Sequence, residues 1–362
     1  MKNTAVENVR TIAFVGHASS GKTSLAEAML NVSGQTSRLG KIEDKNTISD
    51  STPEEQERLC SIHASNLCVE YNGHNLFVAD TPGFADFFGG VIPSTTVSDA
   101  AVVVIDAQHG VEVGTRRAWK LLDELNLPRM IVINKFDKEE VDFSSLMDQL
   151  TEAFGTGCVP IHVPVGQGPG FTGVVDLLGN DQGDADPEMY DTLHTQLVEG
   201  AAETNEELME KYFSEGTLTK DEIVGALRAG ILDASVIPVA ICAATVPAGV
   251  GDVMDAIIAC LPSPVARGET PVEDGEPLTP DPSRPTVARV FRTVTDPYVG
   301  QLTYFRVYQG TVSHASEMMN VTRGHKERLG DLMIIHGKDQ EKIDAATPGD
   351  IVAVAKLKDT HM

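Results

Sequence analysis

Eight residues near the N-terminus have the types and the spacing of a phosphate-binding loop. The run Gly-His-Ala-Ser-Ser-Gly-Lys-Thr at 16–23 fits the pattern of Gly, four residues, Gly-Lys, then Ser or Thr. An apolar run, 11–15, precedes it and a helical pattern, 24–32, follows. Between a strand and a helix, such a loop surrounds phosphates with its backbone amides at the helix N-terminus. The alternative interpretation is a glycine turn before an ordinary helix. The predicted nucleotide contacts here are Gly16, His17, Ala18, Ser19, Ser20, Gly21, Lys22, Thr23 and Ser24.

Two of these side chains have more specific predicted roles, and later residues join them. Lys22 would reach the β- and γ-phosphates, and the Thr23 hydroxyl would bind Mg²⁺. A second motif, Asp80-Thr81-Pro82-Gly83, ends a buried strand. The Asp80 carboxylate could hold Mg²⁺ through water, and the Gly83 amide could face the γ-phosphate. Ser61, from a polar loop, is the remaining candidate Mg²⁺ ligand, and its arrival with the γ-phosphate would make that loop a switch.

A third motif, Asn134-Lys135-Phe136-Asp137, follows another apolar strand and indicates which base is bound. Asp137 can accept hydrogen bonds from the N1 and N2 donors of guanine, which adenine lacks. Lys135 would pack its stem over the base, and Asn134 would tie loops together. The backbone of Ala243 and Ala244 is expected to contact guanine O6. The predicted ligands are therefore GTP or GDP with Mg²⁺.

Short apolar runs alternate with helical patterns through most of the first 262 residues. The expected strands are 11–15, 66–71, 75–79, 101–105, 130–133 and 236–241, and the expected helices are 24–32, 113–125, 143–154 and 250–261. Asn72-Gly73 predicts a hairpin turn, and 34–61 reads as a polar loop with little periodicity. This alternation predicts an α/β fold, a P-loop nucleotide-binding domain with a mostly parallel, doubly wound sheet.

Composition shifts divide the chain further. We expect a GTP-binding domain at 1–157 and 235–262, interrupted by an inserted α+β subdomain at 158–234. A proline-rich linker, 263–285, would lead to a β-barrel domain at 286–362. The formal charge of −25 argues against non-specific binding to DNA. We expect a cytoplasmic protein, because the five cysteines are scattered and the sequence has neither a signal-peptide pattern nor an apolar run of membrane length. We also expect a monomer.

Five segments in order resemble translational GTPases, most closely elongation factor G. They are 53–58 with Ser61-Ile62, Asp80 to Phe87, Phe171 to Asp176, Thr295 to Tyr308, and Gly349 to Asp359. The resemblance implies a GTPase that cleaves GTP to GDP and phosphate on the ribosome, with Lys22, Ser61, Gly83 and the residue at position 84 at the catalytic centre. It also implies translocation as the activity of the full-length protein.

Three departures from the family pattern alter this expectation. Phe84 stands where the family usually has the histidine that orients the attacking water, and an aromatic side chain there suggests an elongation-factor-G-like paralogue. Ser61 stands where Thr is common, and Ser19 where the loop often has Asp. The chain ends at Met362, where full-length members continue, so a truncated barrel and an N-terminal fragment are expected. A GTP-binding module with little hydrolysis, and a ribosomal-protection or termination-type GTPase, are the alternatives.

The resemblance also implies partners. A basic cluster on a predicted barrel loop could touch ribosomal RNA, although a solvated loop explains it equally well. Its members are Arg323, His325, Lys326 and Arg328. The acidic insert could dock the ribosomal stalk protein. No partner is expected for the side chains of His17 and His109.

Overall fold

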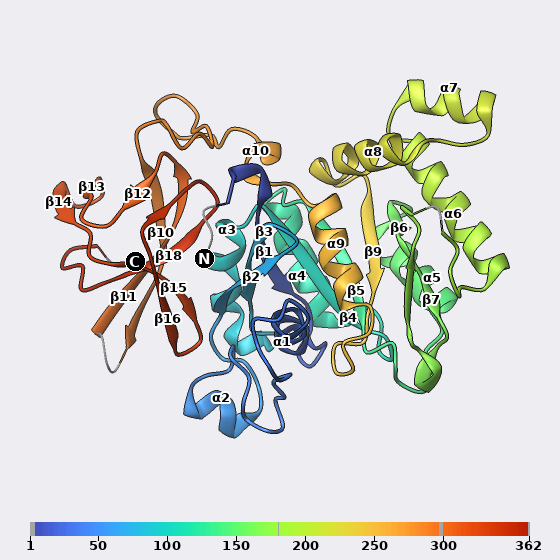
Figure 1. The fold of residues 1–362 in the computed structure, drawn as a ribbon, viewed down its shortest axis with the longest axis horizontal. Coiled ribbons are helices and arrows are strands. Elements are labelled where there is room, and N and C mark those ends of the chain that lie inside the picture. Colours follow the sequence, from blue (N-terminus) through green and yellow to red (C-terminus); the bar gives the residue numbers. More distant parts are fainter. Residues whose placement is uncertain (1–3, 180, 297–299, 361–362) are drawn as a thin grey trace.

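A seven-stranded sheet lies at the centre of the computed structural model, which describes residues 4–179, 181–296 and 300–360 (Figure 1). In spatial order its strands are β2 (Ser65–Tyr71), β3 (His74–Asp80), β1 (Val9–Val15), β4 (Ala100–Asp106), β5 (Arg129–Asn134), β9 (Ile237–Ile241) and β6 (Cys158–Pro160). Only the β2–β3 hairpin in this sheet is antiparallel. Every residue of β1, β4 and β5 is buried, as expected for strands covered on both faces.

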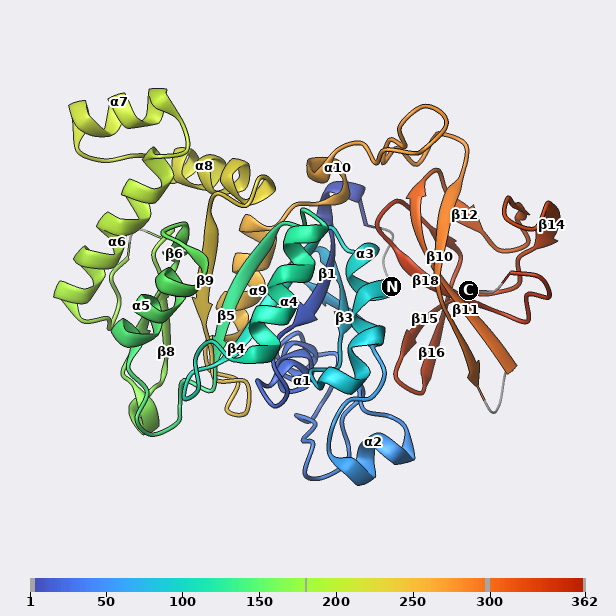
Figure 2. The ribbon, with the colours of Figure 1, turned by 180° about the vertical axis from the view of Figure 1, so that it is seen from behind.

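Helices cover both faces of this sheet (Figures 1 and 2). One face carries α1 (Lys22–Val32) and α9 (Val250–Cys260), and the other carries α3 (Val91–Thr96), α4 (Val113–Glu124) and α5 (Phe143–Phe154). The prediction of a doubly wound sheet is confirmed, with boundaries close to those expected. Because β1, β3, β4, β5 and β9 run parallel, their carboxyl ends meet at one edge, where ligands bind in such folds.

The polar stretch 34–61 contains a helix that the sequence interpretation missed. Helix α2 (Pro53–Arg58) begins with a capping box, in which the Thr52 hydroxyl accepts from the Glu55 amide and the Glu55 carboxylate accepts from the Thr52 amide. Thr-Pro-Glu-Glu is a recognisable helix start, with proline at the first helical position. The absence of a long apolar face concealed it.

The range 158–234 forms a smaller unit beside β9. A hairpin of β7 (His162–Val165) and β8 (Gly173–Asp176) is followed by α6 (Pro187–Ala202), α7 (Glu206–Glu215) and α8 (Lys220–Leu232). The first three residues of this range are β6, which pairs with β9 in the main sheet. None of the described helices is long and apolar enough to cross a lipid bilayer.

The linker contains a single helical turn, α10 (Pro264–Arg267). An all-antiparallel β domain follows it. Five strands form one sheet, in the order β10 (Val287–Asp296), β11 (Gly300–Gln309), β18 (Ile351–Ala355), β15 (Leu332–His336) and β16 (Asp339–Ile343). Two short pairs accompany it, β12 (Val312–Ser313) with β17 (Ala345–Ala346), and β13 (Glu317–Asn320) with β14 (His325–Arg328). Among the described strands, no ladder joins β16 to β10. Positions 297–299, within the family-like run 295–308, and positions 361–362 lie outside the described residues.

A shared core joins the β domain to the seven-stranded sheet. Val9, Phe77 and Val97 pack with apolar side chains of the β domain. At the same interface the Arg306 guanidinium contacts Asp99 Oδ1 at 2.6 Å and donates to the Val97 carbonyl at 2.7 Å. Both charged side chains are almost fully buried, each only 5% exposed. The second domain is therefore held by apolar packing and a buried ion pair.

Candidate nucleotide-binding site

A cleft of about 370 Å³ opens at the carboxyl edge of the parallel strands. Predicted site residues that line it are Ala18, Ser19, Gly21, Lys22, Thr23, Ser24, Ser61, Gly83, Phe84 and Lys135. Lining residues that the sequence interpretation missed are Ile42, Glu43, Asp50, Leu59, Cys60, Gln108, Lys138 and Thr245. The fold thus brings segments as far apart in sequence as Ala18 and Thr245 to one cleft.

The two glycines of the phosphate loop are required by its backbone. Gly16 has φ +144°, and a Cβ there would lie 2.3 Å from the Val104 carbonyl oxygen. Gly21 has φ +91°, and a Cβ there would lie 2.2 Å from Asn134 Nδ2. L side chains rarely adopt these φ values, and both positions lack space for any side chain. The loop can therefore pass close to its neighbours and turn into α1.

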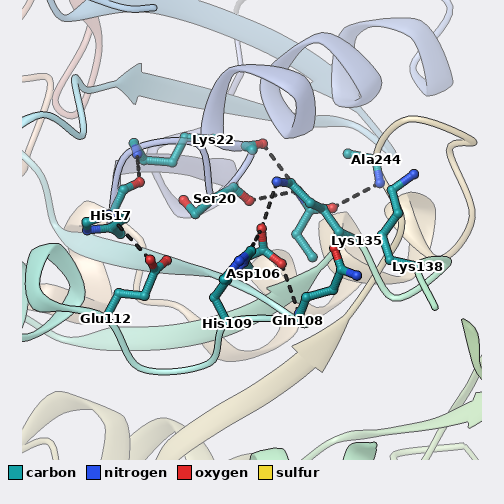
Figure 3. Close-up of polar contacts among 12 residues, drawn as sticks. His17, Ser20, Lys22, Asp106, Gln108, His109, Glu112, Lys135, Lys138 and Ala244 are labelled. Atoms are coloured by element: carbon teal, nitrogen blue, oxygen red, sulfur yellow. Dashed lines mark hydrogen bonds and ion pairs between the residues drawn. The ribbon is translucent and has the colours of Figure 1, made fainter. Parts of the chain in front are cut away.

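The Lys22 side chain lies over the loop itself. Its Nζ donates to the His17 carbonyl at 2.7 Å (Figure 3). It also donates to the Gly16 carbonyl at 3.2 Å. Burial lowers the pKa of Lys22 to about 8, although the Asp80 and Asp50 carboxylates oppose this shift. A phosphate bound in the loop would give this buried ammonium group a direct anionic partner.

The three predicted metal ligands meet at the start of α1. Thr23 Oγ1 donates to Asp80 Oδ2 at 2.8 Å and lies 3.1 Å from Ser61 Oγ. Burial raises the pKa of Asp80 to about 6. Burial, together with the charge of Asp80, raises the pKa of nearby Asp50 to about 7. Hydroxyl and carboxylate oxygens are ligands that suit Mg²⁺, so the residues present fit this ion.

Asn134 connects two loops around the base end of the cleft. Its Nδ2 donates to the Ser20 carbonyl at 3.1 Å, and its Oδ1 accepts from the Ala244 amide at 3.0 Å. The Ala243 amide donates to the Ala248 carbonyl at 2.9 Å. Both alanine amides therefore already have partners within the chain, and guanine O6 would have to share or replace one of them.

Asp137 has one carboxylate oxygen ready for a ligand. Its Oδ1 is buried and has no hydrogen-bond partner among the described residues. Its Oδ2 lies 3.1 Å from Lys138 Nζ. Nearby, Lys135 Nζ contacts Asp106 Oδ2 at 2.7 Å, which holds the lysine stem along the cleft (Figure 3). Although burial works against it, the hydrogen bonds from Lys135 and from the Gln108 amide lower the pKa of Asp106.

The segment after β3 lies against the phosphate loop. Thr81 Oγ1 donates to the Phe14 carbonyl at 2.5 Å. A Cβ on Gly83 would lie 2.6 Å from the backbone nitrogen of Ala18 in the phosphate loop, so only glycine allows this approach. The neighbouring Phe84 is 45% exposed and lines the cleft. Pro82 contributes to a smaller adjoining pocket beneath the loop.

Both histidines that were expected to lack partners have them, and that prediction is wrong. His17 Nδ1 accepts from the Gly114 amide at 3.1 Å, and its Nε2 lies 3.4 Å from Glu112 Oε1 (Figure 3). His109 Nδ1 lies 3.3 Å from Asp106 Oδ2. The partners of His17 come from the N-terminal end of α4, Glu112 directly before the helix and Gly114 in its first turn. Both are far from His17 in sequence, so no local pattern marks them.

Comparison with known proteins agrees with this geometry. Residues 7–263 match the elongation factor Tu GTP binding domain, and residues 285–362 match elongation factor G domain 2. A crystal structure of a protein from Thermus thermophilus superposes with a TM-score of 0.87 and 31% sequence identity. The match covers 98% of this chain and 53% of that protein, so the chain spans about half of its length.

The two family matches together cover most of the chain, in the order in which the two domains are observed. A GTP-binding domain of this kind binds a guanine nucleotide, and the cleft lies within it. The chain therefore belongs to the translational GTPases of the elongation factor Tu and elongation factor G family.

Proposed function

We propose that this chain binds Mg²⁺-GTP in the cleft and hydrolyses it to GDP and phosphate on the ribosome, as part of an elongation-factor-G-like protein. One observation carries the proposal. The carboxyl edge of the sheet brings together a lysine in a glycine loop, a cluster of three oxygen ligands and a carboxylate whose buried oxygen has no hydrogen-bond partner among the described residues. Each feature suits a different part of the same ligand: phosphates, metal and guanine.

Guanine would satisfy Asp137. A buried acceptor without a partner costs free energy, and the N1 and N2 groups of guanine are donors that would remove this cost. Adenine offers an acceptor at N1 and a hydrogen at C2, so it would leave the carboxylate unpaired. Lys135, held by Asp106, would cover one face of the base.

Mg²⁺ would be held by the hydroxyls of Thr23 and Ser61 and, through water, by Asp80, together with nucleotide phosphates. No group of three or more His, Cys, Asp or Glu side chains in the described part of the chain could hold a metal ion alone. Mg²⁺ characteristically uses one or two protein oxygens and substrate phosphates, in contrast to a complete protein cage. When bound, it would neutralise charge on the β- and γ-phosphate oxygens.

Hydrolysis would be the attack of water on the γ-phosphate. The Lys22 ammonium group and the loop amides would stabilise the charge that develops, with the Gly83 amide facing the γ-phosphate. Phe84 has no group that could orient the water. That observation favours a second candidate function, a GTP-binding module that hydrolyses slowly and uses the bound nucleotide only to control ribosome binding.

We also propose the domain limits given above, 1–157 with 235–262, the insert 158–234, the linker 263–285 and the β domain 286–362. Family membership supports a ribosomal partner in general. The β13–β14 hairpin projects from the β domain and bears the basic cluster Arg323, His325, Lys326 and Arg328 (Figure 1). In this proposal the cluster contacts phosphates of ribosomal RNA, and the acidic insert faces the stalk protein.

GTP turnover with and without ribosomes tests this proposal, in the wild type and in Phe84→His. We expect slow turnover by the wild type and a clear increase in the variant, since imidazole can accept a proton from water. Phe87→His, three residues further along, is the matched control and should have no effect. If Phe84→His turns over GTP no faster than the wild type does, the role given to position 84 is wrong.

A further inference from the structure

The segment Ser61–Ala64 connects the metal side of the cleft to the β domain. At one end, Ser61 Oγ lies 3.1 Å from Thr23 Oγ1. At the other end, the Ala64 carbonyl accepts a hydrogen bond from Arg292 Nη1, which belongs to strand β10 of the β domain. Strand β2 begins at the next residue, whose register partner is Asp80. Four residues thus span from a predicted metal ligand to the second domain.

Glu55 fixes the middle of this segment. Its Oε1 accepts from the amides of Ile62 at 3.1 Å and His63 at 3.0 Å. Its Oε2 accepts from the Thr52 amide at 3.1 Å and the Thr52 hydroxyl at 2.8 Å. The side chain is only 2% exposed. Two of these four hydrogen bonds join α2 to the residues that follow Ser61, and the other two hold the carboxylate at the start of α2. Such charge-assisted bonds are stronger than neutral ones.

Arg292 fixes the end of the segment from the other domain. Its guanidinium lies 5.5 Å from the ring centroid of Tyr304, and the preceding residue, Phe291, packs in the shared core. A cavity of about 580 Å³ lies beside the segment, lined in part by Ile62, His63, Ala64 and Arg292. Because one side of the segment faces this cavity, its position depends on the polar contacts of Glu55 and Arg292.

We propose that Glu55 and Arg292 are positioning residues that hold Ser61 toward the metal site, so that the β domain sets the Mg²⁺ dependence of GTP binding. This inference rests on the proposed role of Ser61 as a Mg²⁺ ligand. It predicts that damage to a contact in the second domain weakens metal-dependent binding in the first. Binding of the base and of the phosphates to the loop stays intact, because neither residue lines the nucleotide cleft.

Two measurements test the inference in Glu55→Gln and Arg292→Met. Exposed neighbours supply matched controls, Glu54→Gln on α2 and Arg289→Met on β10. The first measurement is hydrogen exchange at the amides of Ile62 and His63 in protein without nucleotide. We expect exchange there to be about ten-fold faster or more in both test variants, and unchanged in the controls.

The second measurement is the affinity for a fluorescent, non-hydrolysable GTP analogue with Mg²⁺ and with EDTA. In the two test variants the ratio of these affinities should fall about ten-fold, while the affinity in EDTA stays that of the wild type. A role in stability alone would leave this ratio unchanged. If Arg292→Met does not fold, Arg292→Lys replaces it, since lysine keeps the charge but loses the planar fork.

Variants with wild-type exchange and a wild-type Mg²⁺ ratio would overturn the inference. Failure of the proposed function looks different. In that case the wild type itself would not bind the analogue in either condition, whereas exchange at Ile62 and His63 would still show whether Glu55 and Arg292 hold the segment.

Discussion

Asp137→Asn should change the base that the protein binds. In the wild type, Asp137 Oδ1, which has no hydrogen-bond partner in the described part of the chain, would accept one hydrogen bond from guanine N1–H or N2–H, and Oδ2 would accept the other. Hydrogen bonds to a charged group contribute about 1.5–3 kcal/mol each, so two of them amount to about 3–6 kcal/mol, or about 10²- to 10⁴-fold in GDP affinity. Asparagine is nearly the same size but offers one acceptor and one donor, and its donor would face the guanine amine.

Xanthine has a carbonyl oxygen where guanine has that amine, so it should restore binding to Asp137→Asn. The assay is a titration of the wild type and the variant with GDP and with xanthosine diphosphate. Asp148→Asn, on the exposed face of α5, controls for the loss of charge. We expect the preference to reverse in Asp137→Asn alone. The reasoning is refuted if the variant keeps its GDP affinity, or if it loses affinity for both nucleotides equally.

Three further predictions concern stability, the loop and pH. Asp99→Ala should lower the free energy of unfolding by about 3–5 kcal/mol, because the buried Arg306 guanidinium loses its counter-charge. Urea unfolding followed by Trp119 fluorescence measures this loss. A loss below about 1 kcal/mol, as for an exposed ion pair, would contradict the prediction. Gly21→Ala should weaken GDP binding at least about ten-fold, measured by titration, since its φ of +91° and its contact with Asn134 exclude a Cβ. In the folded protein the pKa of Asp50 is about 7, above its usual value. Between about pH 4 and 7 the folded state therefore binds more protons than the unfolded state does, so the free energy of unfolding falls as pH rises. Relative to Asp50→Asn, the wild type should lose up to about 1.4 kcal/mol per pH unit in that window, and parallel pH profiles would count against the burial of this carboxylate.

Much of the α/β fold follows from local sequence pattern. The strands β4 and β5 are apolar runs flanked by turn residues, and both are fully buried as expected. Asn72 and Gly73 adopt positive φ angles, 47° and 75°, as a tight hairpin turn requires. Because each motif directly follows a strand, and parallel strands end at one edge of the sheet, the meeting of Thr23 with Asp80 could be anticipated from order alone.

Several of the residues and contacts that were missed involve acidic or histidine side chains that the fold buries or pairs. Glu55 and Asp50 lie in a polar stretch, where charged residues are usually solvated, yet the fold buries both. Asp106 is the last residue of β4 as Asp80 is the last residue of β3, and this repeated position could have identified it as a site residue. The partners of His17 depend on how α4 packs beside the phosphate loop, and no local pattern encodes that packing.

The central claim is that the cleft binds a guanine nucleotide with Mg²⁺. Competition by unlabelled nucleotides against a fluorescent GDP tests it most directly. The account predicts that GTP and GDP displace the probe at comparable concentrations, and that ATP requires concentrations about 100-fold higher or more, since Asp137 would remain unpaired against adenine. Displacement by ATP as effective as that by GTP, or no binding of the probe in the presence of Mg²⁺, would contradict it.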